Sequence, residues 1–146
     1  MKKLGIIMMC IATLAFASCG AASSVASSDT AAQMNGQTCA SAMINLYNSY
    51  KSTGSITLAN ANNLSNALIV VNSYNQLKQN KGNAAYRKAF TSGLISAGAG
   101  VITAANAESI VNKLLSSTGL NNVNANNISQ NVQTAGAILQ LLQAMK

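Results

Sequence analysis

Apolar residues recur at helical spacing from Thr38 to the end of the chain, and they predict four helices. The predicted helices span residues 38–53, 64–79, 86–116 and 128–146. No strand-like alternation and no hairpin dipeptide interrupts this pattern, and the sequence contains no proline. The pattern therefore predicts an all-α fold whose body resembles a four-helix bundle.

Each predicted helix carries one stripe of apolar residues, which we expect to face the core. The stripe positions are Ala42 or Met43, Leu46 and Tyr50; Leu64, Leu68, Val71, Tyr74 and Leu77; Tyr86, Phe90, Leu94, Ala97, Val101, Ala104, Val111, Leu114 and Leu115; and Ile128, Val132, Ala135, Leu139 and Leu142. Asn, Gln and Ser occupy most other positions, so the predicted surface is polar and sparsely charged.

A six-residue segment occurs twice and suggests an internal duplication. Asn60-Ala61-Asn62-Asn63-Leu64-Ser65 recurs as Asn124-Ala125-Asn126-Asn127-Ile128-Ser129 at an offset of 64 residues, and each copy follows a Ser-Thr-Gly stop. One interpretation is a duplicated helical hairpin that packs twice into a four-helix body. The other is that an Asn-rich composition produces such matches by chance. In the first interpretation each Asn cluster begins a helix, because Asn side chains accept hydrogen bonds from the first backbone amides.

The N-terminal segment has the pattern of an export signal that ends at a cysteine. Two lysines precede an apolar run, Leu4–Phe16, that is too short to cross a bilayer comfortably; small residues and then Cys19 follow. This segment resembles the lipobox of bacterial lipoproteins. The resemblance implies that residues 1–18 are a signal peptide and that the Cys19 thiol accepts diacylglycerol before cleavage. The alternative is a soluble secreted protein with a free cysteine at that position.

Residues 19–37 are rich in Ala, Ser and Gly and show no apolar period. They are expected to form a flexible tether before a helical domain at 38–146. Within them, Asp29-Thr30-Ala31 resembles the acceptor that Bacteroidota use for periplasmic O-glycosylation, so Thr30 is a candidate glycosylation site; a chance match is the alternative. Surface-exported lipoproteins of that lineage often carry acidic residues just after the cysteine. Their absence from residues 20–28 favours the periplasmic face of the outer membrane.

The run Ala89–Ala107 carries no charge and is long enough for a membrane-spanning helix. Within it, Ser92, Ser96 and Gly100 recur at every fourth residue, a spacing that lets helix backbones approach closely. The run is rich in Ala, Gly, Ser and Thr and poor in large aliphatic residues, so insertion into a bilayer would be weakly favoured. We therefore expect a closely packed central helix, with membrane insertion as the alternative.

The sequence offers few groups for catalysis or metal binding. After removal of the signal peptide, seven basic and two acidic residues remain, a net side-chain charge of +5, and the chain has no histidine. Such sparse positive charge in an envelope compartment favours weak contact with anionic lipid over nucleic acid. Without histidine, a Ser-His-Asp triad and imidazole metal sites cannot form, and two acids make no convincing carboxylate pair. We predict no catalytic residue, metal or cofactor, and therefore no enzyme.

Two single residues have alternative interpretations. Cys39 would be the one unmodified cysteine of the processed chain, so no intramolecular disulfide is expected. We interpret it as a small buried residue, with a redox or intermolecular role as the alternative. Glu108 is expected to begin a new helical segment with Asn106 as its cap, or to pair with Lys113 or with a base on another helix.

These patterns predict a small lipid-anchored protein of the cell envelope whose helical domain faces the periplasm and acts as a binding or structural module. The predicted partners are the membrane, through lipid on Cys19, and an envelope protein or glycan. One alternative is a carrier or sensor of an apolar ligand held between helices. Another is a membrane-inserting helical protein built on residues 89–107. The sequence gives no indication of the oligomeric state.

Overall fold

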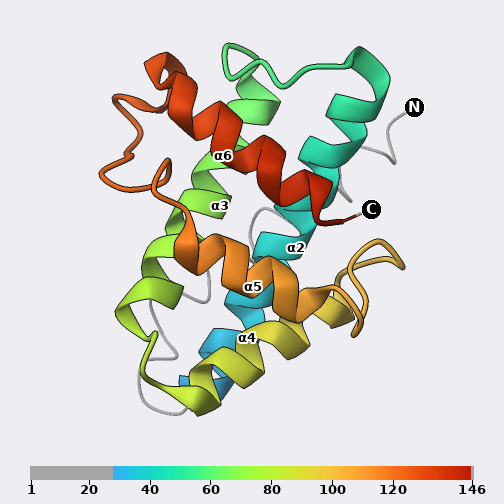
Figure 1. Cartoon of the computed structure of the whole chain (residues 1–146), viewed down its shortest axis with the longest axis vertical. Coiled ribbons are helices and arrows are strands. Elements are labelled where there is room, and N and C mark those ends of the chain that lie inside the picture. The colour runs from blue at the N-terminus through green and yellow to red at the C-terminus, as the bar shows by residue number, and fades with distance from the viewer. Residues whose placement is uncertain (1–27, 146) are drawn as a thin grey trace, which may run out of the picture.

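The computed structural model describes residues 28–145, and this part of the chain is all-α, as predicted. It contains five α-helices and one short 3-10 helix, which Figure 1 shows in their arrangement. The helices are α2 (Ser28–Thr53), α3 (Ala61–Gln79), α4 (Ala84–Ser96), α5 (Ala107–Ser116), the 3-10 helix η1 (Ile128–Gln130) and α6 (Val132–Gln143).

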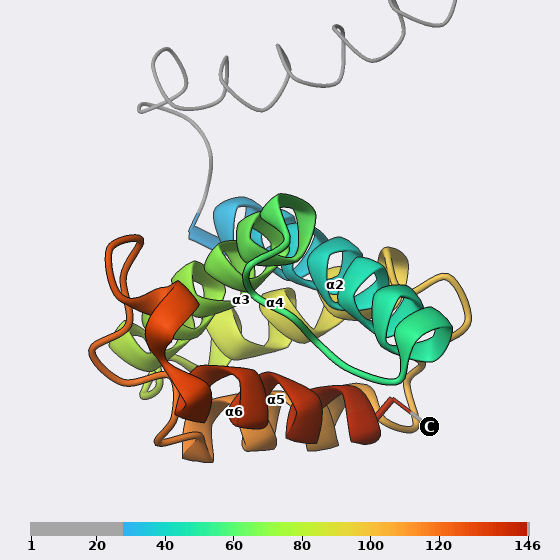
Figure 2. The ribbon, with the colours of Figure 1, turned by 90° about the horizontal axis from the view of Figure 1, so that it is seen from above.

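The helices pack in two layers that share one apolar core. Helices α5 and α6 lie side by side, and α2 and α3 lie on the opposite side of the body (Figure 2). Helix α4 packs most extensively on α2 and also contacts α5, so it joins the two layers. The largest fully buried side chains come from every helix and from two of the loops: Tyr74, Phe90, Met43, Leu46, Leu77, Leu94, Ile102, Ile110, Leu114, Leu120, Ile128 and Ile138.

Helix α2 begins at Ser28, so the second half of the predicted tether is helical. The prediction of a helical domain starting at residue 38 was therefore wrong by ten residues. This part of the helix lacks an apolar period because small residues make its contacts: Ala32 is fully buried, and Gly36 lies against α4. Residues 1–18 and the remaining tether residues before Ser28 lie outside the described part of the chain.

Two glycines set the distance between α2 and α4. A β-carbon added at Gly36 would lie 2.1 Å from the Phe90 carbonyl oxygen, and one added at Gly93 would lie 2.1 Å from the Gln33 carbonyl oxygen. Both obstacles are backbone atoms, which cannot rotate away as a side chain can. The two helices can therefore come this close only because neither position carries a side chain.

The small-residue spacing predicted in this region identified the right helix but not the contacting residue. Ser92 and Ser96 are exposed, and Gly100 lies beyond the end of α4. Gly93, which is buried, makes the close contact instead. The Ser96 hydroxyl accepts a hydrogen bond from Gln37 Nε2 at 3.1 Å, so this serine supports the helix pair from its rim.

The predicted third helix is two helices separated by a loop. Helix α4 ends at Ser96 and α5 begins at Ala107. Between them Ala99 and Gly100 have φ values of 48° and 79°, in the left-handed region that a right-handed helix excludes. The charge-free run 89–107 is therefore not a single helix. No helix within residues 28–145 combines the length and apolar character needed to span a bilayer.

The predicted fourth helix begins later than expected. Ile128 is buried as predicted but lies in η1, and α6 begins at Val132 with Asn131 as its cap. Val132, which was predicted to face the core, is 85% exposed. Leu142 is buried as predicted, and the other buried positions of α6 are Thr134, Ala137, Ile138 and Leu141.

The loops before α3, α5 and η1 are each closed by an asparagine side chain. Each loop contains Ser-Thr-Gly or Ser-Ala-Gly and, four residues after that glycine, a buried aliphatic residue: Leu58, Ile102 or Val123. The asparagine Nδ2 then donates to the carbonyl just before the buried residue. These bonds run from Asn63 to Thr57, from Asn106 to Val101 and from Asn127 to Asn122, at 3.1, 2.9 and 3.0 Å.

This shared loop modifies the duplication hypothesis. Asn60 caps α3 as expected, because its Oδ1 accepts from the backbone N–H groups of Asn62 and Asn63. Asn124 Oδ1 likewise accepts from the N–H of Asn126 at 2.9 Å, but this second copy forms a turn before η1 and does not begin α6. The two copies of the repeat share the loop and not the helix that follows, and the same loop occurs a third time before α5.

Candidate functional site

The predicted modification sites are only partly within the described residues. Cys19 lies outside them. Thr30 is exposed, and it lies in the first turn of α2 and not in a flexible tether. The lipidation of Cys19 and the glycosylation of Thr30 both remain predictions.

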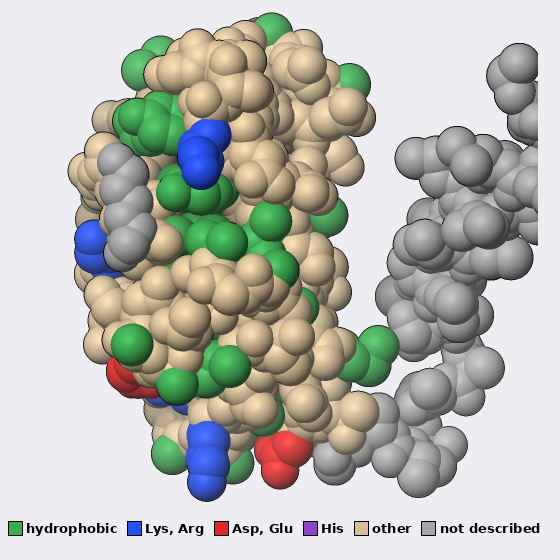
Figure 3. All heavy atoms as spheres, turned by 90° about the vertical axis from the view of Figure 1, so that its right-hand side faces the viewer, with side chains coloured by type: hydrophobic (Ala, Val, Ile, Leu, Met, Phe, Trp, Pro, Cys, Tyr) green, Lys and Arg blue, Asp and Glu red, His purple; other side chains and the backbone are tan. Residues whose placement is uncertain are grey.

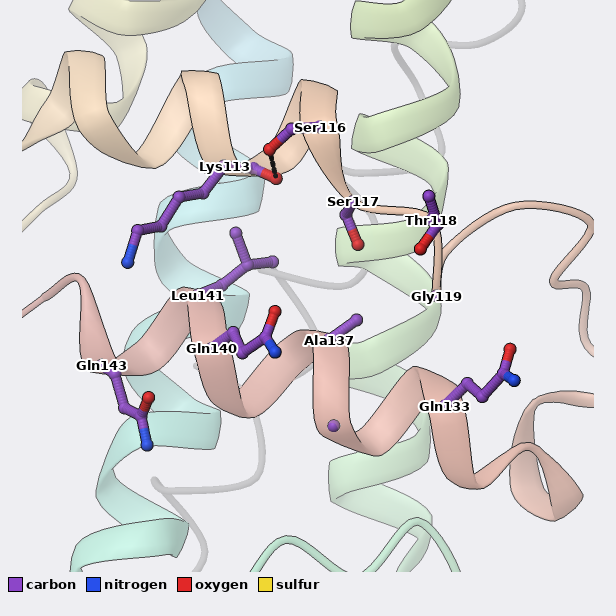
Figure 4. A pocket seen from close by; sticks show the side chains of 11 residues that line it. Lys113, Ser116, Ser117, Thr118, Gly119, Gln133, Ala137, Gln140, Leu141 and Gln143 are labelled. Carbon is purple, nitrogen blue, oxygen red and sulfur yellow. Dashed lines mark hydrogen bonds between the residues drawn. The ribbon is translucent and has the colours of Figure 1, made fainter.

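A polar groove lies between the C-terminal end of α5 and helix α6 (Figure 4). Its volume is about 480 Å³. The last turn of α5 and the segment after it form one side, and α6 forms the other. The lining residues are Lys113, Ser116, Ser117, Thr118, Gly119, Gln133, Gly136, Ala137, Gln140, Leu141 and Gln143.

The side chains of this groove offer hydrogen bonds from both helices. In Figure 4, Ser117 points from the end of α5 toward α6, and Gln140 points from α6 toward α5. Gly136 and Ala137 leave space on the α6 side because they carry little or no side chain. The Ser116 hydroxyl donates to the Lys113 carbonyl at 3.2 Å, which satisfies one backbone acceptor at the helix end.

The chemistry of the α5–α6 groove suits a neutral polar ligand. Amide and hydroxyl groups both donate and accept hydrogen bonds, and Lys113 adds the one charged group of the lining. The lining contains no aromatic ring on which a ligand could stack. Recognition here would therefore depend on hydrogen bonds to a polyhydroxyl or peptide-like surface.

Cys39 belongs to a chain of polar side chains inside the body. Its thiol forms a hydrogen bond with the side chain of Ser73. The Ser73 hydroxyl donates to Asn35 Oδ1 at 3.0 Å, and Asn35 Nδ2 donates to the Tyr86 hydroxyl at 3.0 Å. Desolvation raises the pKa of the Cys39 thiol to about 12, although the bond with Ser73 opposes this rise. A protonated, fully buried thiol is a poor nucleophile. These bonds instead tie α2, α3 and α4 together.

Glu108 lies in the first turn of α5 and pairs with a base on another helix, which was one of the predicted alternatives. Arg87 of α4 donates to the Glu108 carboxylate and also to Asn112 Oδ1, the latter at 2.6 Å. Asn106 precedes α5 as predicted, but its side chain bonds within the loop: its Oδ1 accepts from the Thr103 N–H at 2.8 Å. The ion pair between Arg87 and Glu108 therefore connects α4 to the start of α5.

An apolar ligand held between the helices would have to displace well-packed side chains. Phe90, Leu94 and Ile110 are fully buried in the shared core. Among the described residues, no three His, Cys, Asp or Glu side chains gather where they could hold a metal ion.

Sequence reasoning did not identify the α5–α6 groove. The segment Ser117-Thr118-Gly119 predicts only the end of a helix, and glutamines are expected only as part of the general polar surface. These residues lie close together because α5 and α6 pack side by side after the loop between them. Local periodicity does not predict which helices pack together. The chain matches no protein-family model, no curated protein and no solved structure.

Proposed function

We propose that this chain is a lipid-anchored, periplasm-facing binding module of the cell envelope whose ligand site is the α5–α6 groove. The observation that carries the anchoring is the lipobox-like segment that ends at Cys19. The polar lining of the groove supports a ligand that presents hydroxyl and amide groups, such as an envelope glycan or peptide.

The position of the groove is compatible with such an anchor. In Figure 2 the start of α2 lies on the side of the body away from α5 and α6. A lipid attached before α2 would therefore leave the groove accessible to a ligand. Lys113 is the one charged residue in the lining of the groove, and charged side chains are also few on the face of the body shown in Figure 3.

Anchoring is tested by mass spectrometry of the mature protein and by palmitate labelling in cells. We expect a diacylglycerol-modified Cys19 and label that disappears in Cys19→Ala. Label that persists undiminished in this variant would contradict the anchor.

Binding is tested by sedimentation of the protein with purified peptidoglycan, which presents both hydroxyl and amide groups. We expect Gln140→Ala with Thr118→Ala to reduce the bound fraction, and the exposed Gln79→Ala on α3 to leave it unchanged. Because the expected contacts are mainly neutral hydrogen bonds, added salt should change binding little. A bound fraction equal in all variants would exclude the groove as this ligand's site.

A further inference from the structure

The start of α2 fixes how far the body can be from its anchor. Ser28 is the ninth residue after Cys19. Covalent geometry limits nine residues to about 30 Å in any conformation. On the proposed lipid anchor, on which this inference rests, the start of α2 is thus held near the bilayer surface.

Helix α4 lies beside the start of α2. The first turns of α2 reach α4 through the hydrogen bond from Asn35 to Tyr86 and through the close contact of Gly36 with Phe90. Figure 1 shows the beginning of α2 next to α4 at the lower end of the molecule. The outer surface of α4 is therefore close to the membrane that an anchored chain would occupy.

The outer surface of α4 combines apolar and basic groups. A groove of about 660 Å³ runs along it and is lined by Ala84, Arg87, Lys88, Thr91, Ser92, Ile95, Ser96 and Glu108. Ile95 is 38% exposed, one of three large apolar side chains exposed within residues 28–145. A second, Met34, lies on the part of α2 that packs against α4.

The net charge of the residues around α4 and the start of α2 is positive, even when the two acidic residues there are included. Four of the seven basic residues of the predicted mature chain occur between Lys78 and Lys88, and Lys81 and Lys88 are exposed. Glu108 offsets Arg87, and Asp29 adds one negative charge in the first turn of α2. Exposed apolar side chains flanked by lysines are typical of surfaces that rest in a membrane interface.

We propose that the outer face of α4, with Ile95 and Lys88, docks on the anionic headgroup surface of the membrane that carries the Cys19 lipid. Ile95 and the aliphatic part of Lys88 contact the interface, and the Lys88 ammonium contacts lipid phosphates. The α5–α6 groove, on the side of the body away from the start of α2, then faces the periplasm.

The test measures which face of the anchored protein touches lipid. The lipidated chain is placed in vesicles of phosphatidylethanolamine with phosphatidylglycerol, with a fluorophore on Ser92→Cys in the α4 groove or on Gln140→Cys in the α5–α6 groove. Both positions are exposed, so either substitution should leave the fold intact. We expect lipids brominated near the headgroup to quench the label at position 92 and to leave the label at position 140 unaffected.

Charge is tested with matched lysine variants in the same labelled protein. Lys88→Ser should lower the ratio of docked to undocked orientations by about fivefold, whereas Lys113→Ser, the same change beside the other groove, should not. Equal quenching at both labels, stronger quenching at position 140, or the same quenching in vesicles of phosphatidylcholine alone would overturn the proposal. If mass spectrometry instead finds no lipid on Cys19, it is the proposed anchor that fails.

Discussion

At the scale of single residues, Gly36 and Gly93 decide whether α2 and α4 can pack as they do. We expect Gly36→Ala and Gly93→Ala each to lower the free energy of unfolding by about 1–3 kcal/mol, because the new methyl group meets a backbone carbonyl at 2.1 Å. Chemical denaturation monitored by circular dichroism measures the loss.

The matched control for this prediction is Gly136 in α6, where an added β-carbon meets no atom within 4 Å. Gly136→Ala should raise stability by up to about 1 kcal/mol, because alanine favours the helix. If the alanines at positions 36 and 93 were as well tolerated as this one, the close approach of α2 and α4 would be contradicted.

Burial of Cys39 makes stability depend on pH in a defined direction. Its pKa is raised from 9.0 to about 12 in the folded protein, so above pH 9 the unfolded chain releases the thiol proton while the folded chain keeps it. The contribution of the Cys39 thiol to the free energy of unfolding is fully present below pH 9. It falls as the pH rises above 9, by up to about 1.4 kcal/mol per pH unit.

This pH effect is measured by comparing the mature chain carrying Cys19→Ser with the same chain that also carries Cys39→Ala. The difference in free energy of unfolding between them should shrink as pH rises above 9, because only the first chain has the buried thiol. Parallel stability curves in this range would show that the thiol titrates normally in the folded state.

Sequence reasoning was accurate for Cys39 and inaccurate for the glycines, for one physical reason. A lone cysteine at the start of a predicted helix behaves as a small apolar residue, so its own transfer free energy predicts burial. Gly36 contributes no side chain, and its role exists only because α4 lies against it. Such a residue allows two helices to approach closely, and the residues next to it in sequence do not predict which helix approaches.

At the scale of elements, the asparagine-closed loops determine where helices begin and end. Asn106 makes two bonds across its loop, to the Thr103 N–H and the Val101 carbonyl. We expect Asn106→Ala to lower the free energy of unfolding by about 1–2 kcal/mol, since a partly buried carbonyl loses its donor. Denaturant titration is the measurement.

Asn126 provides the control for the loop prediction. It takes part through its backbone N–H, which donates to Asn124 Oδ1, so Asn126→Ala leaves that bond in place and should change stability by less than about 0.5 kcal/mol. Equal losses for Asn106→Ala and Asn126→Ala would mean that the asparagine side chain does not hold the loop.

The sequence predicted the existence of helices better than their ends. Apolar spacing stayed in register across residues 97–106, so one long helix was expected where the chain forms α4, a loop and α5. The predicted core positions in this stretch were Ala97, Val101 and Ala104, whereas the structure buries Ile102 from the loop and leaves Ala104 exposed. The pattern that marks these loops is Ser-x-Gly followed by Asn. Sequence reasoning used it before α3 and η1 but not before α5.

At the scale of the whole molecule, the all-α fold followed from periodicity, whereas the α5–α6 groove did not. A stripe of apolar residues reports which face of a helix is buried but not which helix covers it. The groove is made by the polar edges of two helices, and its position depends on the loop between Ser117 and Asn131. Sequence reasoning could list its residues as exposed and could not bring them together.

The early start of α2 also has a consequence for how an anchored chain would meet its ligand. A body that begins nine residues after its lipid stays within a thin layer above the bilayer, and its motion is lateral diffusion in the membrane plane. Confinement to this layer raises its effective concentration toward anything else held there and lowers it toward anything deeper in the periplasm. The encounter rate would then depend on copies per unit membrane area, and lengthening the segment before Ser28 would extend the range of ligands within reach.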